Sequence, residues 1–385
     1  MRWWYRAAVI AGVVALIVGI VWLLQQREEP QVQSRLLAPA EQAGGFLRVY
    51  EPAPIEFPLA HGSHPDYQTE WWYYTGNLQT ADGRRFGYQL TFFRRALVPP
   101  ALRTERPSAW AADQVYMAHL ALTDIAGKRH QTTERFARGA AGLAGAQSVP
   151  YRVWLEDWSV EQMGSGAVRL RAAQGEIALD LLLTDRKGPT LQGDRGYSPK
   201  GPDPGNASYY YSLTRLETSG SVRLGDTTNT VSGLSWMDHE WSTTALAADQ
   251  VGWDWFSIQL DDGSELMAFQ LRKTDGSVDP LSSGTFIDAA GSATHLSCDQ
   301  FEIRVDSTWR SPRSGATYPA RWTVSVPSEG LILSIGPYLA AQELTLSFTY
   351  WEGAVQVTGR RAGLSVSGSG YVELTGYAES MQGQF

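Results

Sequence analysis

Strand-like patterning runs through almost the whole chain after about residue 55, and it limits the possible folds more than any other feature. Residues 115–124, 175–185, 208–217, 321–335 and 346–360 show period-two alternation or short apolar runs, with Gly, Asp, Asn and Ser between them. No long amphipathic helix pattern interrupts this series. Many short strands with regular turn signals predict an all-β fold made of sandwiches or barrels.

A faint internal similarity suggests that the β-rich body contains two related units in tandem. Residues 71–90 and 253–271 each give a strand with paired Trp, an Asp-Gly turn and a second strand that ends in Gln-Leu. Asp-Gly between two strands favours a hairpin with a type I′ turn, which needs positive φ angles. We therefore expect an N-terminal domain over residues 56–245 and a C-terminal domain over residues 246–385, with the boundary where residues 242–250 interrupt the strands.

Composition and charge exclude several classes of function. The 385 residues carry a net charge of −8 and no Lys/Arg block in the body, so no nucleic-acid partner is expected. The 15 Trp and 17 Tyr indicate thick cores, a large apolar pocket, or both. Cys298 is the single cysteine, so the chain can form no internal disulfide and has no Cys/His zinc pattern.

The N-terminus predicts a membrane anchor. Arg2 and Arg6 precede an uncharged apolar run from Ala7 to Leu24, which approaches the ~20 residues of a spanning helix. Because the arginines come first, the body should lie in the periplasm or otherwise outside the cytoplasmic membrane. We expect a single-pass anchor over residues 1–26 and a linker over 27–55. A cleaved signal peptide is the alternative interpretation.

The segment HGSHPDYQTEWWYYTGNL, residues 61–78, is the most unusual stretch of the chain. In a strand, Trp71, Tyr73 and Thr75 point to one face, while Glu70, Trp72 and Tyr74 point to the other. Both faces are therefore aromatic, and each must be covered. We expect one face to line an interior cavity and the other to pack against a second domain; a simple aromatic core is the alternative.

A second unusual segment, GLSWMDHEWSTT at residues 233–244, places three ionisable groups between two tryptophans. Asp238 and Glu240 would share one face of a strand. Burying these groups is unfavourable unless they are paired or functional, and two close carboxylates would raise the pKa of one of them enough to make a proton donor. The alternative is a hydrogen-bonded or salt-bridged corner that locks two domains together.

Other chemistries find little support. His61, His64 and Asp66, with His239 and Glu240, form at most a weak metal signal, and we predict no metal or cofactor. His119 alternates with apolar residues and is better explained as a hydrogen-bonded core histidine than as a catalytic one. No GxSxG, P-loop or GxGxxG motif is present, so hydrolase chemistry lacks its usual sequence signal.

HGSHPDYQTEWWYYTGNL, the following GYQLTFFR and the later GLSWMDHEW resemble the AttH/carotenoid 1,2-hydratase family, whose members are often called predicted secreted hydrolases. The resemblance runs from about residue 55 to near the C-terminus. It implies two tandem lipocalin-like β-barrels and a large apolar ligand. It also places Asp238, His239 and Trp241 where the hydratases have site residues. Where the hydratases carry an acidic proton donor on a later strand, this chain offers Glu265.

Three functions stay open at this stage. The first is a membrane-anchored protein that binds a lipid-like or isoprenoid molecule, as an accessory of an ABC export permease. The second is a cofactor-independent hydro-lyase that hydrates an alkene by acid catalysis, and the third is an envelope scaffold. The predicted catalytic residues are Asp238, His239 and Glu240. The predicted ligand-binding residues are His61, His64, Glu70, Trp71, Trp72, Tyr73, Tyr74, His119, Trp236, Trp241, Trp253 and Trp255.

Overall fold

The computed structural model describes residues 44–104, 107–164, 166–244 and 246–383. The predicted anchor over residues 1–26 and the linker up to residue 43 lie outside the described residues. In the described part of the chain, no helix is both long and apolar enough to cross a membrane. The described part of the predicted linker is packed on the body, since Val49 is fully buried and the Leu47 amide donates to the Asp66 carbonyl at 2.9 Å.

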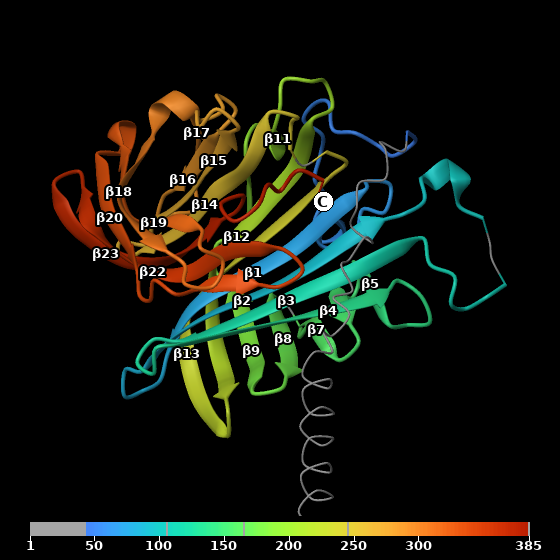
Figure 1. The fold of residues 1–385 in the computed structure, drawn as a ribbon, viewed down its shortest axis with the longest axis horizontal. Helices are drawn as coiled ribbons and strands as arrows, with labels where there is room; N and C mark the ends of the chain where they lie inside the picture. The colour runs from blue at the N-terminus through green and yellow to red at the C-terminus, as the bar shows by residue number, and fades with distance from the viewer. Residues whose placement is uncertain (1–43, 105–106, 165, 245, 384–385) are drawn as a thin grey trace, which may run out of the picture. The chain divides into compact units, whose positions relative to one another are not determined.

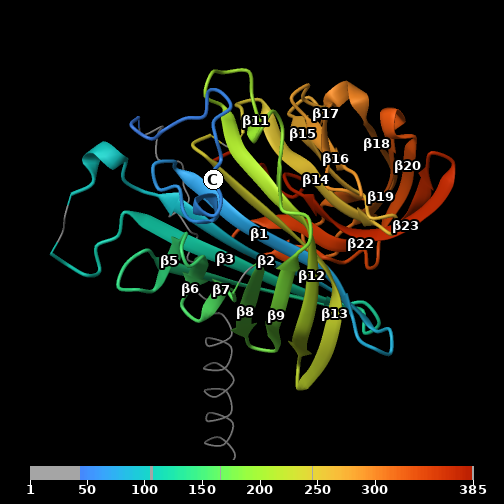
Figure 2. The same ribbon diagram turned by 180° about the vertical axis from the view of Figure 1, so that it is seen from behind.

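The described body is all-β, as expected, and its strands form two curled sheets (Figures 1 and 2). The first sheet has 13 strands in the order β4-β3-β2-β1-β13-β12-β9-β8-β7-β6-β5, and β10 and β11 pair with β12. Its strands are β1 Thr69–Gln79, β2 Arg85–Ala96, β3 Gln114–Asp124, β4 Arg129–Arg138, β5 Ala144–Gln147, β6 Arg152–Leu155, β7 Trp158–Gln162, β8 Ala167–Gln174, β9 Ile177–Asp185, β10 Pro189–Leu191, β11 Tyr197–Pro199, β12 Ala207–Leu224 and β13 Thr227–Ser242.

The second sheet has 10 strands in the order β17-β16-β15-β14-β23-β22-β20-β19-β18, and β21 pairs with β22. Its strands are β14 Gln250–Leu260, β15 Glu265–Lys273, β16 Ser283–Ile287, β17 Ala293–Ser297, β18 Glu302–Arg310, β19 Thr317–Val326, β20 Leu331–Pro337, β21 Glu343–Thr345, β22 Thr349–Arg361 and β23 Leu364–Leu374. Short 3-10 turns lie at Leu59–His61, Pro100–Leu102, Cys298–Gln300 and Pro327–Glu329. In both sheets the first strand pairs with the second and with the last strand of the same sheet, so the two are built alike.

Each sheet curls around its own apolar core. In the first sheet, β3 and β4 contact β5 and β6 from the opposite end of the strand order, so the sheet bends back on itself. Trp72 and Trp158 are fully buried inside it, and Trp322 and Trp351 are buried inside the second sheet. Two curled, barrel-like sheets agree with the tandem-barrel architecture that the resemblance implies.

A third apolar cluster fills the space between the sheets. It includes Tyr73, Trp236 and Trp255. β1 and β2 of the first sheet contact β23 and β22 of the second, and these strands lie side by side in both views (Figures 1 and 2). At Gly87 the approach is so close that an added Cβ would lie 2.6 Å from the Cβ of Ala354, so only glycine fits this position.

The two Asp-Gly hairpins form where the sequence predicts them, but their turn type differs from the prediction. In β1–β2 the left-handed φ of 87° belongs to Gly83 alone, and in β14–β15 the φ of 84° belongs to Gly263 alone. In each hairpin the glycine amide donates to the carbonyl three residues earlier. This pattern is a three-residue loop in which a single glycine takes the left-handed conformation, whereas a type I′ turn needs two such residues. Both hairpins share it, which supports the internal similarity.

Candidate active site between the two sheets

β1 and β13 are hydrogen-bonded neighbours, and they carry both of the unusual sequence segments. In their antiparallel register Tyr73 lies opposite Asp238, and Trp71 lies opposite Glu240. Directly opposite residues project from the same face of a sheet, so these four side chains share one face. That face points to the second sheet, and the other face points into the first sheet's interior. The face that packs against the second domain agrees with the prediction, but the predicted interior cavity is wrong: Trp72 and Tyr74 lie in the packed core of the first sheet, and the pocket lies on the face toward the second sheet.

The interior face carries a buried hydrogen-bond network centred on Glu70. Its Oε1 accepts from His64 Nδ1 at 2.7 Å and from His239 Nε2 at 2.9 Å, and its Oε2 accepts from Arg94 Nε at 2.7 Å. Burial would raise the pKa of Glu70. The charge of Arg94 and the hydrogen bonds from the two histidines outweigh it and hold this pKa well below its usual range. The network ties β1, β2 and β13 together.

The same cluster has the composition of a metal site, since ligand atoms of His64, Glu70 and His239 lie within 4.8 Å of one another. The positive charge of Arg94 would repel a metal ion bound at the Glu70 carboxylate. The oxygens of Glu70 also already accept hydrogen bonds from Arg94 and the two histidines. Asp66 of the metal hypothesis pairs instead with Arg103, at 3.5 Å. The cluster is therefore better explained as a hydrogen-bond network that holds β1, β2 and β13 together than as a metal centre.

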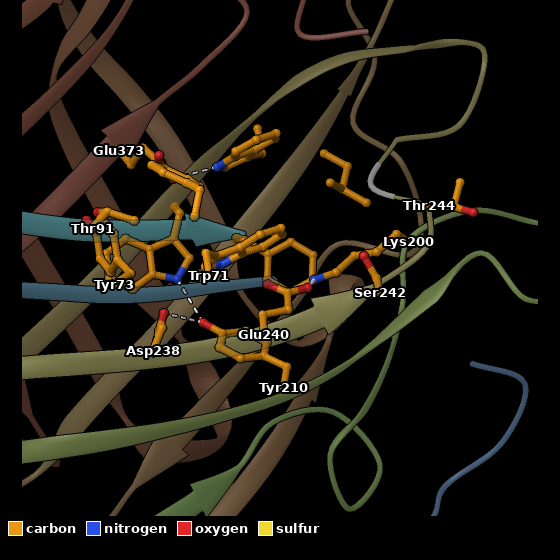
Figure 3. Close-up of a pocket in the computed structure, with 15 residues that line it drawn as sticks. Trp71, Tyr73, Thr91, Lys200, Tyr210, Asp238, Glu240, Ser242, Thr244 and Glu373 are labelled. Carbon is orange, nitrogen blue, oxygen red and sulfur yellow. Dashed lines mark hydrogen bonds and ion pairs between the residues drawn. The ribbon is translucent and has the colours of Figure 1, made fainter. Parts of the chain in front are cut away.

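A pocket of about 80 Å³ lies between the sheets, on the face of β1 and β13 that carries Trp71 and Asp238 (Figure 3). This volume admits the end group of a larger apolar molecule rather than a whole polyene, because drug-sized ligands fill roughly 300 Å³ or more. The pocket has aromatic walls with a few polar groups. Its lining residues are Trp71, Tyr73, Thr91, Phe93, Lys200, Tyr210, Asp238, Glu240, Ser242, Thr244, Trp253, Trp255, Phe269, Leu271 and Glu373.

Asp238 lies near Tyr73 and Thr91 (Figure 3), and because all three are at most 6% exposed they form the inner end of the pocket. Its Oδ1 accepts from Trp236 Nε1 at 2.6 Å, and its Oδ2 pairs with the hydroxyl of Tyr210 at 2.5 Å. Burial raises the pKa of Asp238 to about 7; these hydrogen bonds oppose the shift, and the charge of Glu240 adds to it. A large share of the Asp238 carboxyl is therefore protonated near neutral pH, as an acid catalyst requires.

Glu240 lies two residues further along the same strand face, in an ion pair. Lys200 Nζ is 3.1 Å from its Oε1, and both side chains are at most 10% exposed. The same ammonium lies 4.1 Å from the ring centroid of Phe269 and 5.3 Å from that of Tyr210. The pocket therefore holds, on one strand, a carboxyl with a raised pKa and a carboxylate in an ion pair.

A third acidic group reaches the pocket from the second sheet. Glu373 on β23 accepts from Trp253 Nε1 at 2.6 Å. Burial raises the pKa of Glu373 to about 7, and the charges of Asp238 and Glu240 contribute in the same direction. Both sheets therefore supply acidic groups to one small pocket.

The structure separates the predicted site residues into groups. Asp238, Glu240, Trp71, Tyr73, Trp253 and Trp255 line the pocket, and Trp236 supports Asp238 from beside it. The interior of the first sheet holds His61, His64, Glu70, Trp72, Tyr74, His239 and Trp241. His239, predicted as catalytic, lies on the opposite face from Asp238; its Nε2 contacts Glu70, burial lowers its pKa to about 4, and it does not line the pocket. His119 is buried beside Tyr350 of the second sheet.

Several pocket residues carried no clear signal in the sequence. Lys200 and Glu373 are single charged residues in segments without a motif, and only the fold brings them together. Tyr210 lies in the aromatic run at residues 208–217, which the sequence marked as a strand but not as part of a site. Glu265, expected as the acidic residue of a later strand, does not line the pocket. It is buried between Lys187, at 2.6 Å, and Arg215.

With the site described, comparison with known proteins identifies the family. The AttH-like family model matches residues 48–377. The chain belongs to the AttH-like family. A solved structure of a candidate AttH protein from Nitrosomonas europaea is 37% identical and superposes with a TM-score of 0.77, covering 86% of this chain and all of that one.

More distant relatives of this AttH-like chain include fungal proteins with enzyme names. Kievitone hydratase from Nectria haematococca superposes with a TM-score of 0.63 at 16% identity, covering 87% of this chain and 97% of that one, which shows a shared fold. The dehydratase asqC from Emericella nidulans is 22% identical over 218 residues. That match spans 54% of this chain and 60% of the dehydratase.

Proposed function

We propose that this AttH-like protein adds water to, or removes it from, a carbon–carbon double bond of an apolar molecule whose end group enters the pocket between the sheets. The observation that carries the proposal is the buried Asp238 carboxyl, which lines an aromatic-walled pocket beside the Glu240 carboxylate that pairs with Lys200; burial raises the pKa of Asp238 to about 7. Two carboxyl groups held in different protonation states are the usual means of combining acid and base chemistry in one site.

In the hydration direction, Asp238 transfers its proton to one alkene carbon, which leaves a carbocation on the other. The indole faces of Trp71 and Trp255 line the pocket and stabilise that positive charge. A water molecule attacks the cation, and Glu240 takes the proton that the water releases. Dehydration follows the same steps in reverse. The side chains suffice for this chemistry, so the proposal includes no cofactor and no metal.

The relatives support this class of reaction over simple ligand binding. Two of them carry names of proteins that add or remove water, namely a kievitone hydratase and a dehydratase. The hydratase is 16% identical and the dehydratase match spans 54% of this chain, so kievitone is only a trial substrate for this chain. The proposal keeps only the reaction class and an apolar substrate.

Oxygen labelling tests the proposed reaction. The protein is incubated in H₂¹⁸O with kievitone and, separately, with an acyclic carotenoid, and products are analysed by mass spectrometry. We expect a labelled hydroxyl on a product of at least one compound, with a rate lower by about 100-fold or more in Asp238→Asn. A protein that binds one of these compounds in its pocket but neither hydrates it nor dehydrates the corresponding alcohol contradicts the proposal.

The membrane location is proposed from the sequence and the family resemblance alone. Residues 1–26 would anchor the chain in the inner membrane as a single span, with the body in the periplasm, and an ABC-type export permease would be a partner. In the tandem lipocalin-like arrangement, such a partner would supply or receive the apolar molecule. Alkaline extraction of membranes and protease access to the body in intact cells would test the location.

A further inference from the structure

A row of polar side chains crosses the first sheet from its edge to Asp238. On five adjacent strands the register places Glu134 opposite His119, His119 opposite Thr91, Thr91 opposite Tyr73, and Tyr73 opposite Asp238. Direct cross-strand neighbours share a face, with Cβ atoms about 5 Å apart. β4, which carries Glu134, is the edge strand of the sheet. The row therefore runs from the protein surface to the inner end of the pocket.

Burial changes sharply along this row. The Glu134 side chain is 26% exposed, whereas the other four residues are at most 6% exposed. A buried polar group needs a hydrogen-bond partner in the apolar space between two sheets, and the Tyr73 hydroxyl has none among the described residues. The proposed reaction gives a role to Asp238 but none to the other three buried residues, His119, Thr91 and Tyr73.

The second sheet contributes two polar residues of β22, Tyr350 and Glu352, on the side that faces this row. The Tyr350 hydroxyl is 2.8 Å from His119 Nδ1, which links the two sheets. Glu352 follows two residues later on the same face of β22 and is fully buried. Its cross-strand neighbour on β23 is Glu373, which lines the pocket.

Glu352 is the least satisfied group in this region. Within the described part of the chain, neither of its carboxyl oxygens has a hydrogen-bond partner, and the hydroxyls of Tyr73 and Tyr371 also lack partners. Burial raises the pKa of Glu352 well above its usual range, and the charge of Glu373 contributes, while the nearby Tyr73 and Tyr350 hydroxyls oppose the shift. Buried unpartnered polar atoms gathered in one place indicate ordered water or a proton that moves.

We propose that Glu134, His119, Tyr350 and Glu352 form a proton path that joins the protein surface to the pocket, entering it at Glu373 and Tyr73. Glu352 is the relay in the middle of the path. Several steps of the path are not direct hydrogen bonds. His119 Nε2 lies 3.6 Å from Glu134 Oε2, and Glu352 does not bond the Tyr73, Tyr350 or Tyr371 hydroxyl. Water at these places completes the path.

The role of the path rests on the proposed reaction, which requires a proton to return to Asp238 after each turnover. After one hydration, Asp238 has lost a proton and Glu240 has gained one, so one proton must return to Asp238 before the next turnover. No proton is consumed overall. Tyr73, Thr91 and Asp238 are at most 6% exposed, so this end of the pocket has poor access to bulk water. A path to the edge strand allows the carboxyl to regain its proton there.

Infrared spectroscopy of the purified protein without substrate tests the path. At neutral pH Asp238 and Glu373 also contribute protonated-carboxyl absorption, so the band of Glu352 is taken from the difference between the spectra of the wild type and Glu352→Gln. After transfer to D₂O, this band should shift as the carboxyl proton exchanges, and Glu134→Gln or His119→Phe should slow the shift by about tenfold or more. The matched control is Glu176→Gln, an exposed carboxylate on the loop between β8 and β9, which should leave the exchange rate unchanged.

Two results would overturn the path: no protonated band assigned to Glu352, or exchange as fast in Glu134→Gln as in the wild type. Glu134 lies partly exposed at the sheet edge, so this variant tests the path even if His119→Phe does not fold. The measurement needs no turnover. A protein that exchanges as expected but hydrates nothing refutes the proposed function alone, whereas labelled product without a Glu352 band refutes the path alone.

Discussion

At the scale of single residues, the account depends on two neighbouring acidic groups that the protein keeps in different states. Asp238 receives hydrogen bonds, forms no ion pair with a basic side chain of the described residues, and has its pKa raised by burial to about 7. Glu240 lies on the same strand face and has Lys200 at 3.1 Å. Their spacing in sequence predicted a shared face and a shifted pKa. The sequence could not predict the division of roles, because Lys200 lies 40 positions from Glu240 along the chain.

The pKa of Asp238 predicts a pH-dependent stability. The folded protein binds this proton more tightly than the unfolded chain, where the Asp pKa is near 3.9. The resulting stabilisation is complete below about pH 4 and is lost as the pH rises through about 7. The free energy of unfolding of the wild type minus that of Asp238→Asn should therefore fall with rising pH, by at most about 1.4 kcal/mol per unit. Urea denaturation between about pH 5 and pH 8 measures this difference, and a flat difference would contradict the assignment.

The Lys200–Glu240 pair predicts a coupled effect on stability. Lys200→Met leaves the Glu240 carboxylate buried without its cation, so we expect a loss of about 3 kcal/mol or more in the free energy of unfolding. Adding Glu240→Gln removes the unpaired charge and should recover most of that loss. A double variant no more stable than Lys200→Met alone, in the same denaturation experiment, would show that the two groups do not interact.

At the scale of elements, β1 is the strand with one face in the core of the first sheet and the other face on the pocket between the sheets. Its alternation was readable from the sequence, as were the hairpins that follow it and β14. The Glu70 network was not, because His64, Arg94 and His239 lie on separate segments that only the fold brings together. The turn type also differed, because Asp82 and Asp262 stay out of the left-handed region that a type I′ turn requires.

The two adjacent tryptophans of β1 should respond differently to substitution. Trp72 is fully buried in the first core, so Trp72→Ala should lower the free energy of unfolding by about 3–5 kcal/mol. Trp71 is only partly buried and lines the pocket, so Trp71→Ala should lower it less while weakening the uptake of an apolar fluorescent probe. Denaturation and probe titration of both variants check this. Equal losses of stability would contradict the assignment of the two faces.

At the scale of the whole molecule, the pocket belongs to neither sheet alone. β1, β2, β12 and β13 supply one wall, and β14, β15 and β23 supply the other. The all-β class, the tandem arrangement and the family were within reach of the sequence, because they depend on local patterns and long motifs. The walls of the pocket were not, because which strands of the two sheets face each other is set by close contacts such as Gly87 against Ala354.

The central claim is that the reactive chamber lies between the sheets and not inside the first one. Tyr210 and Tyr211 are adjacent on β12 and test it directly. The Tyr210 hydroxyl pairs with Asp238 and accepts from Trp255 Nε1 in the pocket, whereas the Tyr211 hydroxyl lies 2.7 Å from His61 Nδ1 in the first sheet's interior. Phe substitution removes one hydroxyl in each case.

The decisive measurement is the rate of ¹⁸O incorporation by Tyr210→Phe and Tyr211→Phe, compared at equal concentrations of folded protein. We expect Tyr210→Phe to slow incorporation by about tenfold or more, because it removes the hydroxyl that pairs with the acid. Tyr211→Phe should keep the wild-type rate and lose only about 1 kcal/mol of stability. The opposite order, with Tyr211→Phe slow and Tyr210→Phe unchanged, would place the chemistry inside the first sheet and contradict the account.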